Sequence, residues 1–271
     1  MSIQMDILRV LEGTSRTFAL PIMRLPGKLR DTISVAYLCM RALDEIEDDV
    51  SMENQTKASL LRKISVTMQA HSFSGLNSNF KDLEALLAPY ESKLPEVTLR
   101  LGEWLSNSPS DIAPRIIDAS SSIADRMAYW AERNWLIQNE ADLNGYTFSV
   151  AGAVGLLLCD IWTWFDGTQL NRVSAVQFGR GLQSVNILRN REEDMQRKVD
   201  FFPVGWTTKE MSAYARKLLD SVKLNLKSMP GNAFESLVKI PFYLAEATLD
   251  VIEKGQKKLS REQVLSIIGQ K

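Results

Sequence analysis

The sequence predicts an all-α protein, and three observations support this. Apolar residues recur at intervals of three and four, as at Ile33, Ala36, Met40 and Leu43. Runs of β-branched residues with a period of two are scarce, and only 9 prolines and 14 glycines interrupt the 271 residues. No linker rich in Gly, Ser or Pro divides the sequence, and no repeat is visible. We therefore expect a single helical domain over residues 1–271.

The helical pattern divides into separate segments, and several boundaries have a local cause. Pro26 and Pro114 fit the first turns of two helices, because proline lacks the N–H group that a first turn leaves unpaired. Thr207 and Glu210 form a capping-box pattern that begins a helix after the turn at residues 201–203. His71 stands in the polar stretch HSFSGLNSN, which we predict to be a loop. The expected helices are 3–12, 28–50, 55–71, 79–90, 94–106, 110–134, 145–166, 170–198, 208–228, 231–254 and 260–269.

The most apolar segment runs from Phe148 to Phe165 and is nearly long enough to span a bilayer. It carries Asp160 and has three small residues, Ala151, Gly152 and Gly155. These features favour a buried core helix that neighbouring helices approach closely. The small residues would also leave a groove beside the helix, wide enough for an isoprenoid chain.

Composition narrows the range of functions. The 32 basic residues against 33 acidic ones give a net charge of −1, which argues against nucleic acid as the main partner. Cys39 and Cys159 are too few for a disulfide framework, so a reducing cytoplasm is expected. A single histidine excludes His-ligated zinc sites and leaves a Ser-His-Asp triad only one candidate. The start has no secretory pattern, so we expect a soluble protein with at most peripheral membrane contact.

The first candidate site is the acidic face of the helix expected at 28–50. Asp44, Glu47 and Asp48 stand at i, i+3 and i+4, so their carboxylates project from one helical face. Like charges at this spacing repel one another, and folding does not require them. Magnesium does require such oxygen ligands, because it commonly bridges one or two carboxylates to substrate phosphates. A solvated acidic face is the alternative.

The second candidate site repeats this geometry on the helix expected at 170–198. Asn190, Glu193 and Asp194 stand at the same spacing, with an amide in the first place. Gln183 and Asn186 precede Asn190 on the same face, while neighbouring faces of these turns are apolar. Two such clusters in one all-α protein are more specific than either alone. Together they predict magnesium ions held around a diphosphate.

Basic and aromatic residues complement the acidic ones. Arg16, Arg41 and Arg189 are suited to forked contacts with phosphate oxygens, although Arg41 can alternatively pair with Glu45 alone. Aromatic rings can line an isoprenoid groove and stabilise an allylic cation. The candidate rings are Phe18, Tyr37, Phe148 and Trp162. For Phe148 and Trp162, core packing is the simpler explanation.

Four motifs in this order resemble the squalene/phytoene synthase family of head-to-head prenyl transferases. They extend over about two-thirds of the chain, and they are SRTF at 15–18, YLCMRALDEIEDD at 37–49, YTFSVAGAVG at 146–155 and LQSVNILRNREED at 182–194. The resemblance implies an all-α isoprenoid-synthase bundle with a central cavity. It also implies Mg²⁺ as cofactor and prenyl diphosphates as substrates.

The resemblance assigns roles residue by residue. Asp44 and Asp48 match the first metal-binding aspartates, Asp194 matches the last aspartate of the second motif, and Tyr146 matches a tyrosine at the reacting centre. The residues that match positions contacting diphosphate or its metals are Ser15, Arg16, Arg41, Gln183, Asn186 and Arg189.

Three positions depart from the family pattern, and they decide which reaction we expect. Asn190 replaces an aspartate, Val199 replaces an arginine, and Ser149 replaces a larger residue. An amide brings no negative charge to a metal, so one metal site loses a unit of countercharge. A cation formed without an acceptor alkene would be quenched by water. This pattern resembles a bacterial member of the family regarded as a farnesyl diphosphate phosphatase.

We therefore expect magnesium-dependent hydrolysis of farnesyl diphosphate to farnesol. Head-to-head condensation to squalene, dehydrosqualene or phytoene is the first alternative. A non-catalytic helical assembly factor is the second. The oligomeric state is expected to be a monomer or a homodimer.

Overall fold

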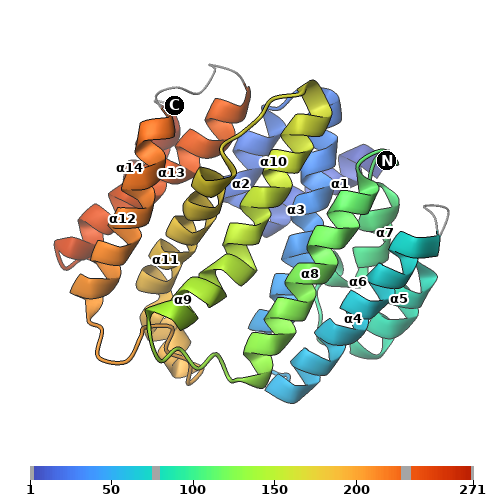
Figure 1. Ribbon diagram of the computed structural model, residues 1–271, viewed down its shortest axis with the longest axis horizontal. Helices are drawn as coiled ribbons and strands as arrows, with labels where there is room; N and C mark the ends of the chain where they lie inside the picture. Colours follow the sequence, from blue (N-terminus) through green and yellow to red (C-terminus); the bar gives the residue numbers. More distant parts are fainter. Residues whose placement is uncertain (1–2, 75–79, 227–232, 270–271) are drawn as a thin grey trace. The chain divides into compact units, whose positions relative to one another are not determined.

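The computed structural model describes residues 3–74, 80–226 and 233–269, and in these residues every regular element is helical (Figure 1). The predicted all-α class is therefore confirmed. The side chains of Arg16 and Thr17, and those at 72–74, 224–226, 233–234 and 236, lie outside the described part. The chain separates into two compact units, Met1–Asn134 with Asp160–Thr168 and Trp135–Cys159 with Gln169–Lys271. The single domain over 1–271 stays a prediction.

The first unit is built around one long helix, α3. Its residues Leu38, Leu43 and Ile46 are completely buried, because α1, α2, α4, α6, α7 and α8 all pack on it. Apolar burial of this kind is the main stabilising contribution to a helical domain. The helices are α1 (Ile3–Thr14), α2 (Arg16–Met23), α3 (Gly27–Asp48), α4 (Asn54–Ser74), α5 (Lys81–Leu87), the 3₁₀ turn η1 (Ala88–Tyr90), α6 (Glu96–Leu99), α7 (Leu101–Ser106) and α8 (Ala113–Glu132).

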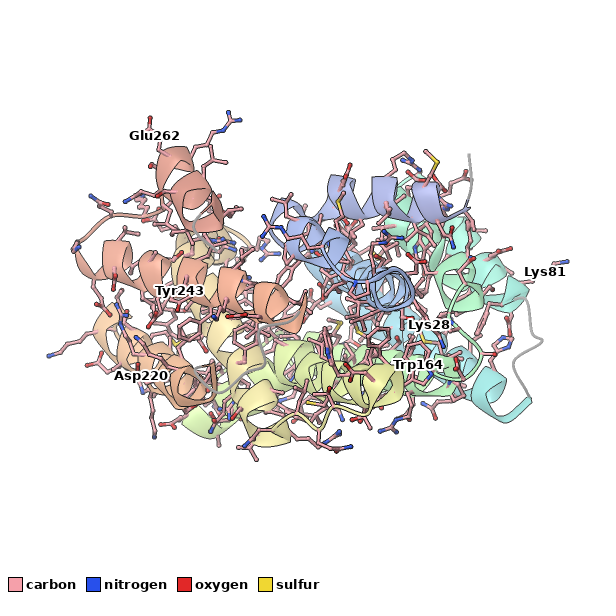
Figure 2. All side chains as sticks on the ribbon, turned by 90° about the horizontal axis from the view of Figure 1, so that it is seen from above. Lys28, Lys81, Trp164, Asp220, Tyr243 and Glu262 are labelled. Carbon is pink, nitrogen blue, oxygen red and sulfur yellow. The ribbon has the colours of Figure 1, made fainter. Side chains whose placement is uncertain are left out.

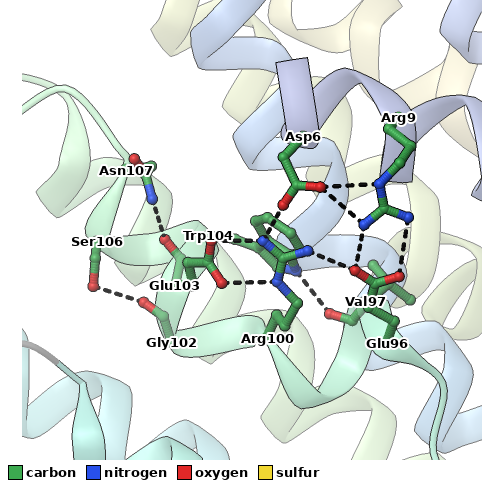
Figure 3. A network of polar contacts seen from close by, with 10 residues as sticks. All are labelled: Asp6, Arg9, Glu96, Val97, Arg100, Gly102, Glu103, Trp104, Ser106 and Asn107. Atoms are coloured by element: carbon green, nitrogen blue, oxygen red, sulfur yellow. Dashed lines mark hydrogen bonds and ion pairs between the residues drawn. The ribbon is translucent and has the colours of Figure 1, made fainter. Parts of the chain in front are cut away.

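The helix expected at 94–106 is two helices, and an ion-pair network surrounds the residue between them. Arg100 leaves the helical conformation between α6 and α7, with φ −98° and ψ 17°. Its guanidinium lies 2.6 Å from carboxylate oxygens of Glu96 and Glu103, also pairs with Asp6 of α1, and lies over the Trp104 ring (Figure 3). Two ion pairs tie α1 to this region, Arg9 with Glu96 and Arg100 with Asp6, and Arg100 is the residue at which the helix is interrupted.

The segment 160–168 belongs to this unit through side chains from two other elements. Arg115 of α8 donates to Asp160 over 2.6 Å, and the Lys28 ammonium lies 4.2 Å from the centre of the Trp164 ring (Figure 2). These contacts fix the C-terminal half of α10 (Ala153–Asp166) against the start of α3 and against α8.

Several sequence-based expectations in the first unit need correction. His71 is in α4 and not in a loop, because its ring packs on Phe80 and its Nε2 lies 2.7 Å from an oxygen of Asp82. α2 was not expected at all. Pro26 is the residue before α3 and not in its first turn, whereas the predicted place of Pro114 in the first turn of α8 is confirmed.

The second unit consists of α9 (Glu140–Thr147), a π-helical turn η2 (Phe148–Gly152), the first half of α10, α11 (Arg172–Gln196), α12 (Thr208–Leu226), α13 (Ala233–Glu253) and α14 (Arg261–Gly269). α11 is its central element and packs on η2, α9, α12 and α13. The predicted capping box is confirmed, since a Glu210 oxygen accepts the Thr207 N–H over 2.8 Å at the start of α12.

Glycines allow α11 to approach η2 and α10 at backbone distance. A Cβ atom at Gly155 would lie 2.3 Å from the Ala175 carbonyl oxygen, and one at Gly179 would lie 2.3 Å from that of Ala151. The close approach predicted for the small residues is therefore confirmed. The groove expected beside Gly152 and Gly155 is wrong, because α11 fills that space.

One helix among the described residues, Glu140–Asp166, is long and apolar enough to cross a membrane by length and composition alone. Within its most apolar window, 44% is buried inside the protein. A buried core helix has the same length and composition, and Trp162 at 1% exposure confirms core packing for this residue.

Candidate functional site

One face of α3 gathers four of the predicted site residues. Tyr37, Arg41, Asp44 and Asp48 follow one another at steps of three or four residues, so they lie along a single stripe of the helix. The repeating spacing alone places them there. The stripe offers, in order, a hydroxyl, a guanidinium and two carboxylates.

The N-terminus of α2 lies against the N-terminal end of this stripe, at Tyr37. Ser15 is the N-cap of α2, and its Oγ accepts the N–H of Phe18 over 3.2 Å. Its side chain also hydrogen-bonds with Tyr37, whose pKa is raised by burial and lowered in part by this bond. The rings of Phe18 and Tyr37 lie 5.9 Å apart. The structure therefore brings Ser15, Phe18 and Tyr37 together at this end of the stripe, while the diphosphate contact implied by the SRTF motif stays a prediction.

Arg41 has two acidic neighbours and one unused donor. It pairs with Glu45, the alternative recognised in the sequence, and its Nη1 also lies 3.8 Å from an oxygen of Asp44. Its buried Nε has no hydrogen-bond partner among the described residues. A buried donor without a partner is costly, so this atom is suited to an oxygen supplied by a ligand.

The Asp44 carboxylate stands where burial disfavours its charged form. Desolvation raises the pKa of Asp44 to about 7, with the Asp48 charge adding to the shift and the Arg41 charge opposing it. Asp44 is nevertheless 38% exposed, so a solute can reach it. Glu47 differs, because it is only 8% exposed and its carbonyl accepts the buried Lys57 ammonium over 2.7 Å. The accessible acidic face is thus Asp44 with Asp48, not all three carboxylates.

This pair fits a magnesium ion that also binds substrate oxygens. Among the residues that the structure describes, no three His, Cys, Asp or Glu side chains converge on a point where they could enclose a metal. Magnesium does not need such a cage, because it keeps water and phosphate oxygens alongside one or two carboxylates. A cation beside Asp44 and Asp48 would also relieve the cost of ionising Asp44.

An open hollow of about 410 Å³ adjoins the C-terminal end of the stripe, at Asp48. Asp48 lines it together with Glu45 and Asp49, and Lys93 adds an ammonium group from the segment before α6. Sequence reasoning missed Lys93, since no motif surrounds it and only the tertiary fold brings it to the same hollow as Asp48.

The polar face of α11 is a network of amides fixed by one arginine. Arg189 donates to Asn186 Oδ1 over 2.6 Å and to Asn190 Oδ1 over 3.1 Å. The Asn190 amide donates in turn to Asn186 Oδ1 over 3.2 Å. Gln183 lies half-buried one turn before Asn186. The structure therefore places the predicted amide and guanidinium groups on one helix face. At Asn190 the group is a neutral amide that already bonds with Asn186 and Arg189.

The acidic end of α11 is paired with cations. Lys258 lies 2.9 Å from an oxygen of Glu193, and this hydrogen bond lowers the Glu193 pKa. Asp194 is buried and pairs with Arg197 one turn later. These two carboxylates are paired more closely than Asp44, whose Arg41 neighbour lies 3.8 Å away, so a metal there would compete more strongly with positively charged side chains.

The end of α11 shows the surroundings of Val199, which replaces an arginine of the family pattern. The Val199 N–H donates to the Asp194 carbonyl and the Lys198 N–H to that of Met195, which together form a Schellman motif with Lys198 at φ 62°. Arg197, two residues before the family's arginine position, is the side chain that reaches Asp194.

Tyr146 is buried, with 4% exposure, at the end of α9. Its ring stacks on Phe201 with centroids 4.6 Å apart and an interplanar angle of 17°. The π-helical turn η2 begins two residues later, and such turns are frequent at functional sites. The remaining predicted residue, Arg16, has its side chain outside the described part.

The chain matches known proteins over most of its length. Residues 11–213 match the model of the squalene/phytoene synthase family. The squalene synthase of Schizosaccharomyces pombe is 29% identical over 253 residues, which cover 88% of this chain and 53% of that protein. The chain spans about half the length of the curated relatives it matches.

Two solved structures share the fold. TcSQS in complex with the ligand E5700 has a TM-score of 0.79 and 21% identity, over 98% of this chain and 85% of that one. A dehydrosqualene synthase in complex with a ligand has a TM-score of 0.69 and 16% identity, over 98% and 94%. The helical fold expected from the four motifs is therefore confirmed, while its central cavity stays a prediction.

Proposed function

The chain belongs to the squalene/phytoene synthase family, and from this premise we propose that it is a magnesium-dependent enzyme that condenses two prenyl diphosphates head to head. The family is that of the squalene and phytoene synthases, and the relatives and structures named above are synthases, which favours condensation over the hydrolysis expected first. The accessible Asp44 and Asp48 pair beside Arg41 is the observation that carries this proposal.

The α3 stripe supplies what a diphosphate requires. Asp44 and Asp48 would hold magnesium, which neutralises phosphate charge and makes diphosphate a better leaving group. Arg41 would bind an adjacent phosphate oxygen through its guanidinium, whose buried Nε has no partner among the described residues, and the hydroxyl groups of Ser15 and Tyr37 would lie next to it. The C–O bond of one substrate then breaks, its electron pair leaves with the diphosphate, and an allylic cation remains.

The double bond of the second prenyl diphosphate attacks this cation and forms the new C–C bond. The resulting cation loses a proton as a cyclopropane ring closes. The second diphosphate then leaves with its electron pair, and the final cation loses a proton or takes a hydride from NADPH. Both substrates must therefore be held at once, with water excluded. Tyr146 would act at this stage, because a phenol and its stacked partner Phe201 present aromatic faces that stabilise positive charge. On α11, Gln183, Asn186 and Arg189 are the donors for a diphosphate.

Hydrolysis of farnesyl diphosphate is the second candidate, and Asn190 is the observation in its favour. This position carries a neutral amide that already bonds with Asn186 and Arg189. A metal there would gain one unit of negative charge less than at an aspartate. If the second diphosphate is bound weakly for this reason, water captures the cation and farnesol results. An assembly role without catalysis has no such support, since the family is enzymatic.

Product analysis separates these candidates. The purified chain is incubated with farnesyl or geranylgeranyl diphosphate, with magnesium or EDTA, with and without NADPH, and the extracts are analysed by mass spectrometry. We expect a C30 or C40 product that requires magnesium and is lost in Asp44→Asn. Prenyl alcohol as the sole product would support hydrolysis instead, and no turnover of either substrate would refute both. The cytoplasmic location, the peripheral membrane contact and the monomer or homodimer stay predictions.

A further inference from the structure

One arginine of α11 spans the π-helical turn that follows Tyr146. The Arg180 guanidinium pairs with Asn144 Oδ1 and donates to Thr147 Oγ1 over 3.3 Å, and these residues flank Tyr146 on α9. The aliphatic stem of Arg180 lies at the other end of the turn, where a Cβ atom added to Gly152 would be 3.1 Å from Arg180 Cγ. A single side chain therefore contacts both ends of η2.

The guanidinium is bound only by neutral groups in the part of the chain that the structure describes. It donates to the Tyr214 hydroxyl over 2.7 Å, and this hydroxyl donates to Asn144 Oδ1 over 2.7 Å. Thr147 is completely buried, and Tyr214 is 7% exposed. Charge-assisted hydrogen bonds in such a setting are stronger and more directional than neutral ones, so they restrict the groups they join.

The π-turn makes this restriction relevant to Tyr146. A π-turn inserts an additional residue into the helix and is less favourable than continued α-helix, so it persists where its surroundings hold it. Stacking on Phe201 holds only the ring of Tyr146. Arg180 holds the side chains of Asn144 and Thr147, the residues on both sides of this ring.

We propose that Arg180 is a positioning residue for Tyr146, acting through Asn144, Thr147 and the π-turn η2. This rests on the proposed function, in which Tyr146 serves the reacting centre. Sequence reasoning did not identify Arg180, because it precedes the motif at 182–194.

The test compares variants that remove the guanidinium and keep the rest. Arg180→Met retains the stem against Gly152, while Asn144 keeps its bond from Tyr214, so folding should survive. Arg180→Lys retains the charge. Arg216→Met is the matched control, because Arg216 of α12 also bonds to side chains of another helix, Asp250 and Glu253, away from η2.

Kinetics with farnesyl diphosphate form the first arm. We expect Arg180→Met to lower kcat by roughly ten- to a hundred-fold, with KM changed by less than about three-fold, and Arg180→Lys to recover part of this loss. In a Tyr146→Phe background, Arg180→Met should have little further effect, because both changes disable the same group. Additive effects of the two substitutions, or an unchanged kcat in Arg180→Met, would overturn the proposal.

Amide hydrogen exchange forms the second arm, and it does not depend on turnover. Exchange in residues 144–152 should accelerate by about ten-fold or more in Arg180→Met and not in Arg216→Met. Unchanged exchange there would overturn the proposal even in an active enzyme. If the parent fails to turn over any prenyl diphosphate, the proposed function fails and Tyr146 has no catalysis to serve, while faster exchange would still show that Arg180 holds the turn.

Discussion

The close contact between α11 and η2 predicts a large penalty for one methyl group. In Gly179→Ala the new Cβ would lie 2.3 Å from the Ala151 carbonyl oxygen, whereas ordinary contacts begin near 3.4 Å. The obstacle is backbone, so α11 or η2 must move by roughly 1 Å. Overpacking of this kind costs about 3 kcal/mol, and the better helix propensity of alanine returns up to about 1 kcal/mol.

A net loss of about 2 kcal/mol corresponds to a melting temperature lower by roughly 4–8 °C for a chain of this size. The control is Gly13→Ala in α1, where an added Cβ meets nothing within 4 Å. This control should leave the melting temperature equal or slightly higher. Differential scanning calorimetry of both variants is the assay. A melting temperature for Gly179→Ala at or above that of the parent would refute the proposed contact between α11 and η2.

Three other predictions concern the candidate site and the core. Asp44→Asn should abolish magnesium-dependent turnover. Because the pKa of Asp44 is raised in the folded protein, the parent loses stability as pH rises from about 4 to about 7. Without magnesium, the variant should therefore melt above the parent at pH 8 and at the same temperature as the parent at pH 4. Equal melting temperatures at pH 8 would contradict the desolvation of Asp44. Asn190→Asp should lower the magnesium concentration that gives half-maximal turnover and increase the condensed product relative to prenyl alcohol, and an unchanged magnesium titration would place Asn190 outside the metal site. Cys39 and Cys159 are buried, and desolvation raises the Cys39 pKa. Neither thiol should therefore react with DTNB until the protein is unfolded. Rapid reaction of the native protein would show that the surrounding core is open.

Local features of this protein were predictable from sequence because their causes lie within one or two helical turns. The stripe from Tyr37 to Asp48 follows from the 3.6-residue period, and the Thr207 cap requires only Glu210 three residues later. The resemblance of four short motifs then provided the family and its fold. None of these inferences required knowledge of which helices are neighbours.

Errors occurred where a distant residue determined the outcome. His71 is helical because of Asp82 and Phe80, and the helix at 94–106 breaks where Arg100 reaches Asp6 of α1. The sequence shows a helix former or a polar stretch in each case. It does not show the partner that overrides this local preference.

The spacing of carboxylates, amides and arginines along the chain is enough to place them on shared faces of two helices. Their surroundings follow from how the helices pack: Asp44 stays accessible while Glu47 is buried, Lys258 pairs with Glu193 from 65 residues away, and glycines admit a helix backbone rather than a prenyl chain. The physical reason is that helical periodicity depends on neighbouring residues, whereas burial and ion pairing depend on which surfaces pack together.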